Sequence, residues 1–282
     1  MGLKGLRVLD ELLTRFGKEF ILCVVSARDK KVQNDYYQEI ADCCSKNNIR
    51  FYNRTDTVFD AGAFRIAIGW KWLISNTDRL IVLHDSLLPK YRGFNPLVTT
   101  LLQGDAEMGA TAIWASSQPD EGNIIATASR TIQYPVKIEQ AIKWMADCYI
   151  EICLHICSEI KAGRQLPSTP QKEKASYSLW RDELDYLVDW EKDAVFISRF
   201  VDALGFPYKK ASTTVNGALI RIQDAEACPD LFIANRAPGK VFKLQGEIAY
   251  VVCGSGILAL KNMTRDDNGL PFFPETVRTR FV

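Results

Sequence analysis

The sequence predicts an α/β protein in two domains, a parallel sheet covered by helices in residues 1–176 and a linker with a smaller β-barrel domain in residues 177–282. Two patterns carry this prediction. Short apolar runs alternate with amphipathic segments through the first part of the chain, which is typical of strand–helix–strand units and therefore of a parallel sheet. After Gly205 the runs become short and are separated by turn residues, which indicates a small barrel.

The chain opens with leucines at helical spacing, preceded by Gly2 and Gly5. Glycines before a helix are typical of the turn that follows a first parallel strand, yet no strand stands before them. Either that strand lies upstream of Met1 or the sheet has a gap. The first is favoured, because a gap would leave backbone groups of both neighbouring strands unpaired.

The remaining elements of the first domain follow in order. Strands are expected at residues 20–25, 49–52, 64–68, 80–84, 108–115 and 123–132, and helices at residues 36–46, 95–103 and 138–161. The last helix has an apolar stripe that predicts burial in the core.

Residues 163–176 are rich in Pro, Lys, Ser and Gln and predict a linker. A short helix is expected at residues 194–204, and short strands at residues 219–222, 239–242, 248–252 and 257–260.

Composition excludes several classes of protein. The chain has 282 residues, 47% hydrophobic and 24% charged, with a net charge of +1. This balance argues against a strongly basic nucleic-acid surface. No apolar run is long enough to span a bilayer, and no signal-peptide pattern opens the chain, so we expect no membrane partner and a cytoplasmic location.

The eight cysteines are expected to be reduced and mostly buried, since none forms a Cys-x-x-Cys pair. Cys153, His155 and Cys157 have spacing that suggests metal ligands, but on a helix His155 points away from the face that the two cysteines share. We therefore expect no metal.

His84 is one of only two histidines and ends the apolar run 80–83. Histidine changes charge near neutral pH and suits acid or base catalysis. A side chain at the carboxyl end of a buried parallel strand lies where open α/β sheets bind ligands. The alternative interpretation is a hydrogen-bonded residue at the end of a strand.

Residues 82–93 read Val-Leu-His-Asp-Ser-Leu-Leu-Pro-Lys-Tyr-Arg-Gly, followed by Gly109-Ala110-Thr111 and Asp120-Glu121-Gly122. This pattern resembles the family of formyltransferases that use 10-formyltetrahydrofolate, with the Asn-x-His-x-Ser-x-Leu-Pro motif, a Gly-x-Thr strand and an Asp-x-Gly turn. The resemblance implies a Rossmann-like formyltransferase core, a C-terminal OB-like β-barrel and an enzyme that transfers one-carbon units. One position departs from the pattern, because Val82 stands where the family has Asn.

By this resemblance, His84 and Asp120 are the catalytic residues. His84 would stabilise the oxyanion or act as a base, and Asp120 would orient it and relay protons. The implied folate site comprises Trp70, Lys71, Trp72, Leu73, Ile74, Gln118, Pro119 and Asp120. For the two tryptophans, packing of a helix on the sheet is an equally strong interpretation.

Val82 cannot donate the hydrogen bond that the family's Asn gives to the oxyanion. Loss of one such donor typically lowers the rate about 100- to 1,000-fold. Three outcomes are open. Another amide such as Asn95, or a backbone N–H, donates the missing hydrogen bond. Otherwise the enzyme is slow, or the protein binds folate without catalysing the transfer. Retention of His84 and Asp120 favours an active enzyme.

Two branches of the family compete for the acceptor. One formylates methionyl-tRNA, and the other formylates an amino sugar carried by a nucleotide. Residues 191–282 contain twelve basic and ten acidic side chains, which is a thin excess for binding a tRNA backbone. Phe94-Asn95 also resembles the sugar branch. We therefore expect a sugar N-formyltransferase that contributes to a surface polysaccharide or glycan.

The residues expected to bind the nucleotide-linked amino sugar are Arg92, Phe94, Asn95, Arg181, Tyr208 and Lys209. The resemblance also suggests a homodimer. Weaker alternatives are a folate-binding protein without activity, a formylfolate hydrolase, and a dehydrogenase, which lacks support because no Gly-x-Gly-x-x-Gly is present.

Overall fold

The computed structural model describes residues 2–29, 32–56 and 62–282. Two compact units divide the chain. The first comprises residues 1–100, 105–132 and 140–180, and the second comprises residues 101–104, 133–139 and 181–282. The boundary predicted between residues 176 and 177 remains a prediction.

The first unit begins with α1 (Gly2–Phe16), a 3₁₀ turn (Lys18–Phe20), β1 (Cys23–Ser26), α2 (Tyr37–Lys46) and β2 (Arg50–Asn53). Leu9 of α1 packs with Val24, Ile40, Cys44 and Ile49, and Phe51 of β2 packs against this cluster, so both helices and both strands share one core. Gly2 and Gly5 lie inside α1 and not in a turn before it, since the leucine spacing extends the helix to the first described residue.

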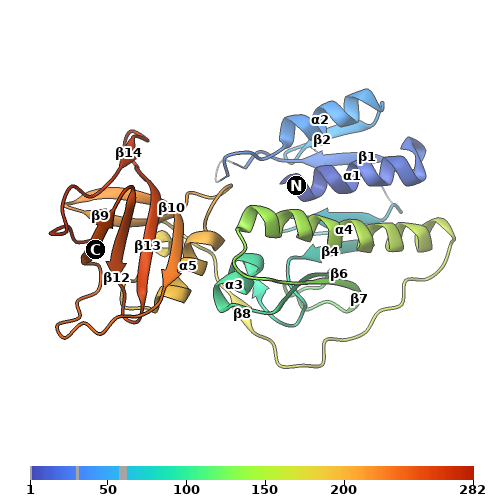
Figure 1. The fold of residues 1–282 in the computed structure, drawn as a ribbon. Coiled ribbons are helices and arrows are strands. Elements are labelled where there is room, and N and C mark those ends of the chain that lie inside the picture. Colours follow the sequence, from blue (N-terminus) through green and yellow to red (C-terminus); the bar gives the residue numbers. More distant parts are fainter. Residues whose placement is uncertain (1, 30–31, 57–61) are drawn as a thin grey trace. The chain divides into compact units, whose positions relative to one another are not determined.

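A second group consists of β3 (Arg65–Ile68), β4 (Leu80–His84), β6 (Glu107–Trp114) and β7 (Ile124–Thr131), in that order across one sheet. The short helix α3 (Pro96–Gln103) connects β4 to β6, and the long helix α4 (Ile138–Lys161) lies along the sheet (Figure 1). The Tyr149 hydroxyl of α4 contacts the Leu83 carbonyl, which fixes the helix against β4.

The prediction of a single parallel sheet is wrong in two respects. β1 and β2 pair in parallel, and so do β3 and β4, but these are separate sheets among the described residues. β4–β6 and β6–β7 are antiparallel. Residues 115–123 join β6 to β7 without an intervening helix, and neighbouring strands joined in this way run antiparallel. Whether a strand precedes Met1 remains a prediction.

The second unit contains α5 (Ala194–Ala203) and strands β9 (Ala211–Val215), β10 (Ala218–Cys228), β11 (Val241–Gln245), β12 (Ile248–Val252), β13 (Ile257–Arg265) and β14 (Pro271–Phe272). They form an antiparallel sheet of order β11-β12-β13-β10-β9, with β14 paired to β13. Within the described ranges these strand pairs do not form a closed ring, so the barrel remains a prediction.

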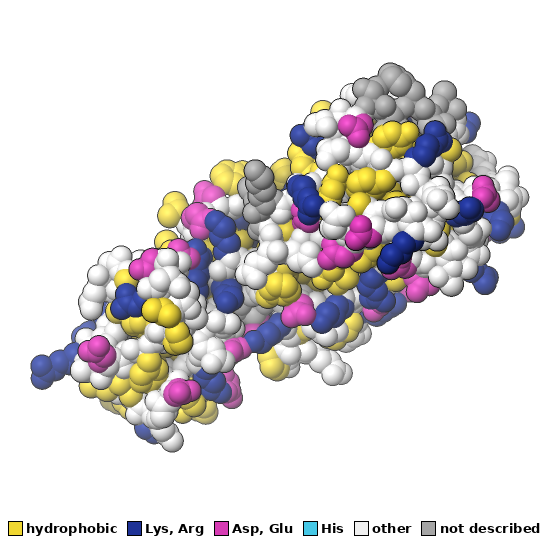
Figure 2. All heavy atoms as spheres, turned by 90° about the horizontal axis from the view of Figure 1, so that it is seen from above, with side chains coloured by type: hydrophobic (Ala, Val, Ile, Leu, Met, Phe, Trp, Pro, Cys, Tyr) yellow, Lys and Arg dark blue, Asp and Glu magenta, His cyan; other side chains and the backbone are white. Residues whose placement is uncertain are grey.

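Two features of the described residues bear on partners. No helix in the described ranges is both long and apolar enough to cross a bilayer. On the face drawn in Figure 2, basic and acidic side chains are interspersed and do not gather in one basic patch.

Candidate active site

β4 carries His84 to the edge of its sheet. Leu80, Ile81 and Leu83 are buried on this strand, and His84 itself is 7% exposed. Its Nε2 lies 2.8 Å from the carbonyl oxygen of Tyr91. A carbonyl only accepts hydrogen bonds, so Nε2 carries a proton and the second ring nitrogen, Nδ1, determines the charge of the ring.

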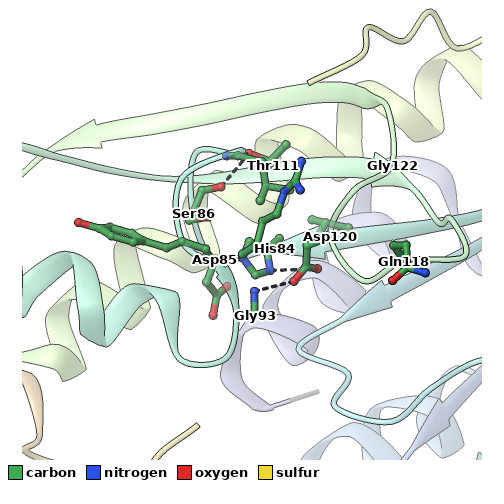
Figure 3. A network of polar contacts seen from close by, with 12 residues as sticks. His84, Asp85, Ser86, Gly93, Thr111, Gln118, Asp120 and Gly122 are labelled. Carbon is green, nitrogen blue, oxygen red and sulfur yellow. Dashed lines mark hydrogen bonds and ion pairs between the residues drawn. The ribbon is translucent and has the colours of Figure 1, made fainter. Parts of the chain in front are cut away.

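The loop after β4 is held by Thr111 of β6. The Thr111 hydroxyl donates to the Ser86 carbonyl oxygen at 2.7 Å and accepts from the Leu88 backbone N–H at 3.0 Å. This explains why a threonine follows two residues after Gly109 in the sequence pattern. The side chain is fully buried and stabilises the backbone beside His84 (Figure 3).

Asp120 lies in the loop between β6 and β7 and faces His84 (Figure 3). Its Oδ1 is 3.4 Å from His84 Nδ1, and its Oδ2 accepts from the Gly93 backbone N–H at 2.8 Å. The structure therefore brings together the histidine, the aspartate and the Arg-Gly turn that lie far apart in the sequence.

Two glycines permit this arrangement. Gly93 has φ of 101°, and a Cβ there would lie 2.5 Å from the Ser178 carbonyl oxygen. At Gly122 a Cβ would lie 1.6 Å from the Trp114 carbonyl oxygen. Any side chain at either position would displace a loop that carries part of the His84–Asp120 pair.

The pair shares one proton. Because Nε2 is protonated, a neutral His84 would direct its Nδ1 lone pair at the Asp120 oxygen, and two acceptors repel. A proton between Nδ1 and Oδ1 removes this conflict, either as imidazolium with carboxylate or as imidazole with carboxylic acid. Such a pair has the geometry of a group that accepts a proton and returns it.

Asp85, next to His84, joins a second polar network. Its carboxylate forms an ion pair with Lys4 of α1 and accepts from the Tyr149 hydroxyl at 2.6 Å. Burial acts to raise the pKa of Asp85, but Lys4 and Tyr149 hold that pKa below its usual value. Burial and Asp85 raise the pKa of Tyr149 well above its usual value. Asp85 therefore anchors α1 and α4 to the end of β4.

The expected folate residues 70–74 follow β3, which is parallel to β4, so both strands end at the same edge. The rings of Trp70 and Trp72 meet edge to face at 5.1 Å, and Lys71 forms an ion pair with Asp29. Trp70 Nε1 is buried and makes no hydrogen bond within the described chain. Leu73 is 91% exposed.

For the other expected residues, the described part of the structure shows positions but no contact that indicates a role in binding. Gln118 lies on the same loop as Asp120, and its carbonyl oxygen accepts from Ser116 at 2.7 Å. Phe94 is 55% exposed, and Asn95 has φ of 50°. Roles for these residues, and for Pro119 and Ile74, remain predictions.

Three expected substrate residues lie in the second unit. Lys209 forms an ion pair with Glu183, which also lies 3.5 Å from Arg221. Arg181 lies near Tyr208, and burial lowers the pKa of its guanidinium. The Nε atom of Arg181 is buried without a hydrogen-bond partner in the described chain. These three residues therefore belong to one region of the second unit, whereas Arg92 belongs to the first unit.

Sequence reasoning missed Gln171, Lys4 and Tyr149. Gln171 lies in the predicted linker and bonds both Arg92 and the loop of Asp120. Lys4 and Tyr149 lie on helices whose apolar spacing indicated only core packing. No local pattern marks them, since their partners are distant in sequence. In the described residues no group of His, Cys, Asp and Glu side chains is arranged to hold a metal.

Comparison with known proteins identifies the family. Residues 54–146 match the Formyl transferase model, and residues 182–269 match the model of the Formyl transferase C-terminal domain, together more than half of the chain. A methionyl-tRNA formyltransferase from Streptococcus sanguinis is 25% identical over 68% of this chain and 60% of its own length. The chain thus spans about 60% of the curated relatives that it matches.

Solved structures agree in fold. WlaRD, a sugar 3N-formyl transferase, has a TM-score of 0.70 and 18% identity over 92% of this chain and 94% of its own. An N-formyltransferase from Helicobacter canadensis has a TM-score of 0.70 and 17% identity over 92% of this chain and 96% of its own. With the two family models, these findings show that the chain belongs to the formyl transferase family.

Proposed function

We propose that this protein transfers a formyl group from 10-formyltetrahydrofolate to the amino group of a nucleotide-linked amino sugar. The observation that carries the proposal is the His84–Asp120 pair, in which Nδ1 and Oδ1 lie 3.4 Å apart at the carboxyl end of β4, where open α/β sheets bind ligands. Formyl transfer needs a group that takes a proton from the amine and returns one to the folate nitrogen.

The residues of the chain have distinct tasks in this reaction. A bond forms between the amine nitrogen and the formyl carbon, and the bond from that carbon to the folate nitrogen breaks. Asp120 accepts the proton that the amine loses, and the His84–Asp120 pair returns it to the departing folate nitrogen. Positive charge on His84 stabilises the negative oxygen of the tetrahedral intermediate. The products are the N-formyl sugar and tetrahydrofolate.

Two observations support folate as the donor. Both relatives with the same fold were solved with folate derivatives, 5-N-formyl-tetrahydrofolate in one and folinic acid in the other. In this chain the aromatic pair Trp70–Trp72 follows β3, which is parallel to β4, and the buried Trp70 Nε1 lacks a hydrogen-bond partner in the described chain.

The solved structures with the same fold support a nucleotide-linked amino sugar as the acceptor. WlaRD, a sugar 3N-formyl transferase, and the Helicobacter canadensis N-formyltransferase each cover 92% of this chain, and the second was solved with dTDP-3-aminofucose. The small positive excess of residues 191–282 fits a nucleotide sugar better than tRNA. Arg181, Tyr208 and Lys209 are candidates for binding the nucleotide.

We also propose that the second unit is an OB-like barrel. Backbone hydrogen bonds support this, because the C-terminal segment joins Thr214 of β9 through Val282 and Gly239, before β11, through Phe281.

Methionyl-tRNA formylation is the second candidate, because curated relatives at 25–30% identity are named methionyl-tRNA formyltransferase. A third outcome is a folate-binding protein with weak turnover, since Val82 replaces the family's Asn. Val82 is paired in register with Ile113 and Ala67 and offers no donor to an oxyanion.

The test is a turnover assay with 10-formyltetrahydrofolate, a panel of nucleotide-linked amino sugars, and methionyl-tRNA. We expect formylation of one sugar, lost in His84→Ala and retained in His155→Ala, which removes the exposed second histidine. Formylation of the tRNA alone would overturn the choice of acceptor. Folate binding without turnover on any acceptor would overturn the proposed activity.

A further inference from the structure

A single glutamine side chain connects the two loops of the active site. Gln171 lies between α4 and β8 (Tyr177–Ser178) in the segment that the sequence marks only as a linker. It contacts Arg92 of the loop that follows His84, and it contacts the loop that carries Asp120. We call Arg92, Gln171 and Glu121 the clamp.

The contacts of the clamp form a continuous chain. Gln171 Oε1 accepts from Arg92 Nη2 at 2.8 Å and from Arg92 Nε at 3.2 Å. Gln171 Nε2 donates to the Asp120 carbonyl oxygen at 2.8 Å and to the Gly122 carbonyl oxygen at 2.9 Å. Arg92 Nη1 completes the clamp with Glu121 Oε1 at 2.7 Å.

Only one orientation of the Gln171 amide satisfies these contacts. Two N–H donors of Arg92 face one end of the amide, and two carbonyl acceptors face the other. Reversal would place donor against donor and acceptor against acceptor. The Arg92 side chain is 13% exposed, so water replaces these bonds poorly. The Arg92–Gln171 contact is therefore specific and partly shielded, whereas Glu121 is 43% exposed.

The clamp fixes the residue on which the proposed chemistry depends. Asp120 has φ of 58°, an uncommon conformation for a residue other than glycine, and Gly122 lies against the Trp114 carbonyl oxygen. Gln171 binds the backbone at both of these positions. From this backbone position the carboxylate of Asp120 reaches both His84 Nδ1 and the Gly93 N–H.

We propose that Gln171 and Arg92 are positioning residues that act through Asp120, and that Arg92 does not serve mainly as a contact for the sugar substrate. This inference rests on the proposed function for its kinetic consequences. It differs from the assignment of Arg92 to substrate binding, because three of the guanidinium N–H groups are already committed to Gln171 and Glu121.

The kinetic test uses Gln171→Leu, Arg92→Lys and the double variant. Lysine retains the charge but cannot form the forked contact. Displacement of a catalytic group by about 1 Å costs about 100-fold in rate. We expect each single variant to lower kcat about 10- to 100-fold with KM changed less than about twofold, and the double variant to fall within about threefold of the worse single.

Gln140→Leu is the matched control, since it makes the same substitution at an exposed glutamine of α4. A higher KM for the sugar with unchanged kcat in Arg92→Lys would overturn the proposal, as would losses that multiply in the double variant. Circular dichroism excludes unfolding as the cause. If Gln171→Leu does not fold, Gln171→Glu retains the Arg92 contacts and removes only the donation to the two carbonyls, with the same outcomes.

A second measurement does not depend on turnover. The chain has two histidines, so ¹⁵N NMR of the imidazoles gives few signals, and His155→Gln assigns them. We expect the Nδ1 resonance of His84 to shift in Gln171→Leu and to stay unchanged in Gln140→Leu, because the partner Asp120 moves. An unchanged resonance in Gln171→Leu refutes the positioning role. If the wild-type protein transfers no formyl group, this measurement still decides the role of the clamp.

Discussion

Replacement of Lys4 by methionine should destabilise the end of β4. Lys4 provides the positive charge that faces Asp85, and its ammonium also lies 5.0 Å from the centre of the Tyr149 ring. Methionine fills similar space without the charge. Asp85 then keeps the hydrogen bond from the Tyr149 hydroxyl, but its enclosed carboxylate loses the ammonium that faces it.

The magnitude follows from the burial of the pair. The side chains of Lys4 and Asp85 are 14% and 21% exposed. Removing one partner of a fully buried pair costs about 3–5 kcal/mol, whereas an exposed pair contributes about 0.2–1 kcal/mol. For this partly enclosed pair we expect a decrease of about 2 kcal/mol in the free energy of unfolding, lost from the unit that contains α1 and β4.

The pH dependence has a definite sign. The folded state holds the pKa of Asp85 below its usual value of 3.8. Its ionised form therefore contributes stability above about pH 4, and this contribution is lost as pH falls through the lowered folded pKa. The deficit of Lys4→Met should be greatest near pH 7 and should shrink in acid, where Asp85 becomes neutral in both proteins.

Urea unfolding followed by circular dichroism measures the difference at several pH values. The control is Asp85→Asn in the Lys4→Met background, which removes the unpaired charge and still accepts from Tyr149. This double variant should be more stable than Lys4→Met alone. Equal stability of Lys4→Met and wild type at pH 7, or a deficit that grows in acid, would refute the reasoning.

Three further predictions concern the site and the second unit. Val82→Asn should raise kcat about 10- to 100-fold if an oxyanion donor is missing, and an unchanged rate in the turnover assay would show that another group supplies it. Gly122→Ala should lower kcat at least about 100-fold, because the new Cβ would meet the Trp114 carbonyl oxygen at 1.6 Å and displace Asp120; activity near that of wild type would contradict this. Burial raises the pKa of Asp202 to about 6, so its stabilising contribution is complete below about pH 4 and is lost as pH rises through 6; Asp202→Asn should increase the free energy of unfolding by about 2–3 kcal/mol at pH 8 and leave it unchanged at pH 4, as measured by urea denaturation.

Several elements could be predicted from the sequence because local patterns specify them. The apolar run 80–83 and the stripe of 138–161 gave β4 and α4 with their observed bounds. His84 was a candidate because it is one of only two histidines in the chain and because it lies at the end of such a strand. The pattern from Val82 to Gly93, with the Asp-x-Gly turn, led to the family that the comparisons confirm.

Pairing between strands was less predictable. Apolar runs show that strands exist, but not which strands are neighbours or in which direction they run. The division into β1–β2 and β3-β4-β6-β7, and the antiparallel β6 and β7, depend on connections and on packing across the whole unit. The strand β9 was missed because its polar residues Ser212, Thr213 and Thr214 do not read as an apolar run.

The sequence by itself determined the family, the principal strands and helices, and the two side chains that carry the proposed chemistry, since each depends on residues close together in the chain. Only the tertiary structure decided that Asp120 faces His84, that Lys4 and Tyr149 enclose Asp85, and that Gln171 joins Arg92 to the loop of Asp120. The two residues of each contact lie 36 to 81 positions apart in the chain. Hydrogen bonds and ion pairs depend on distance in space, which a local pattern does not record.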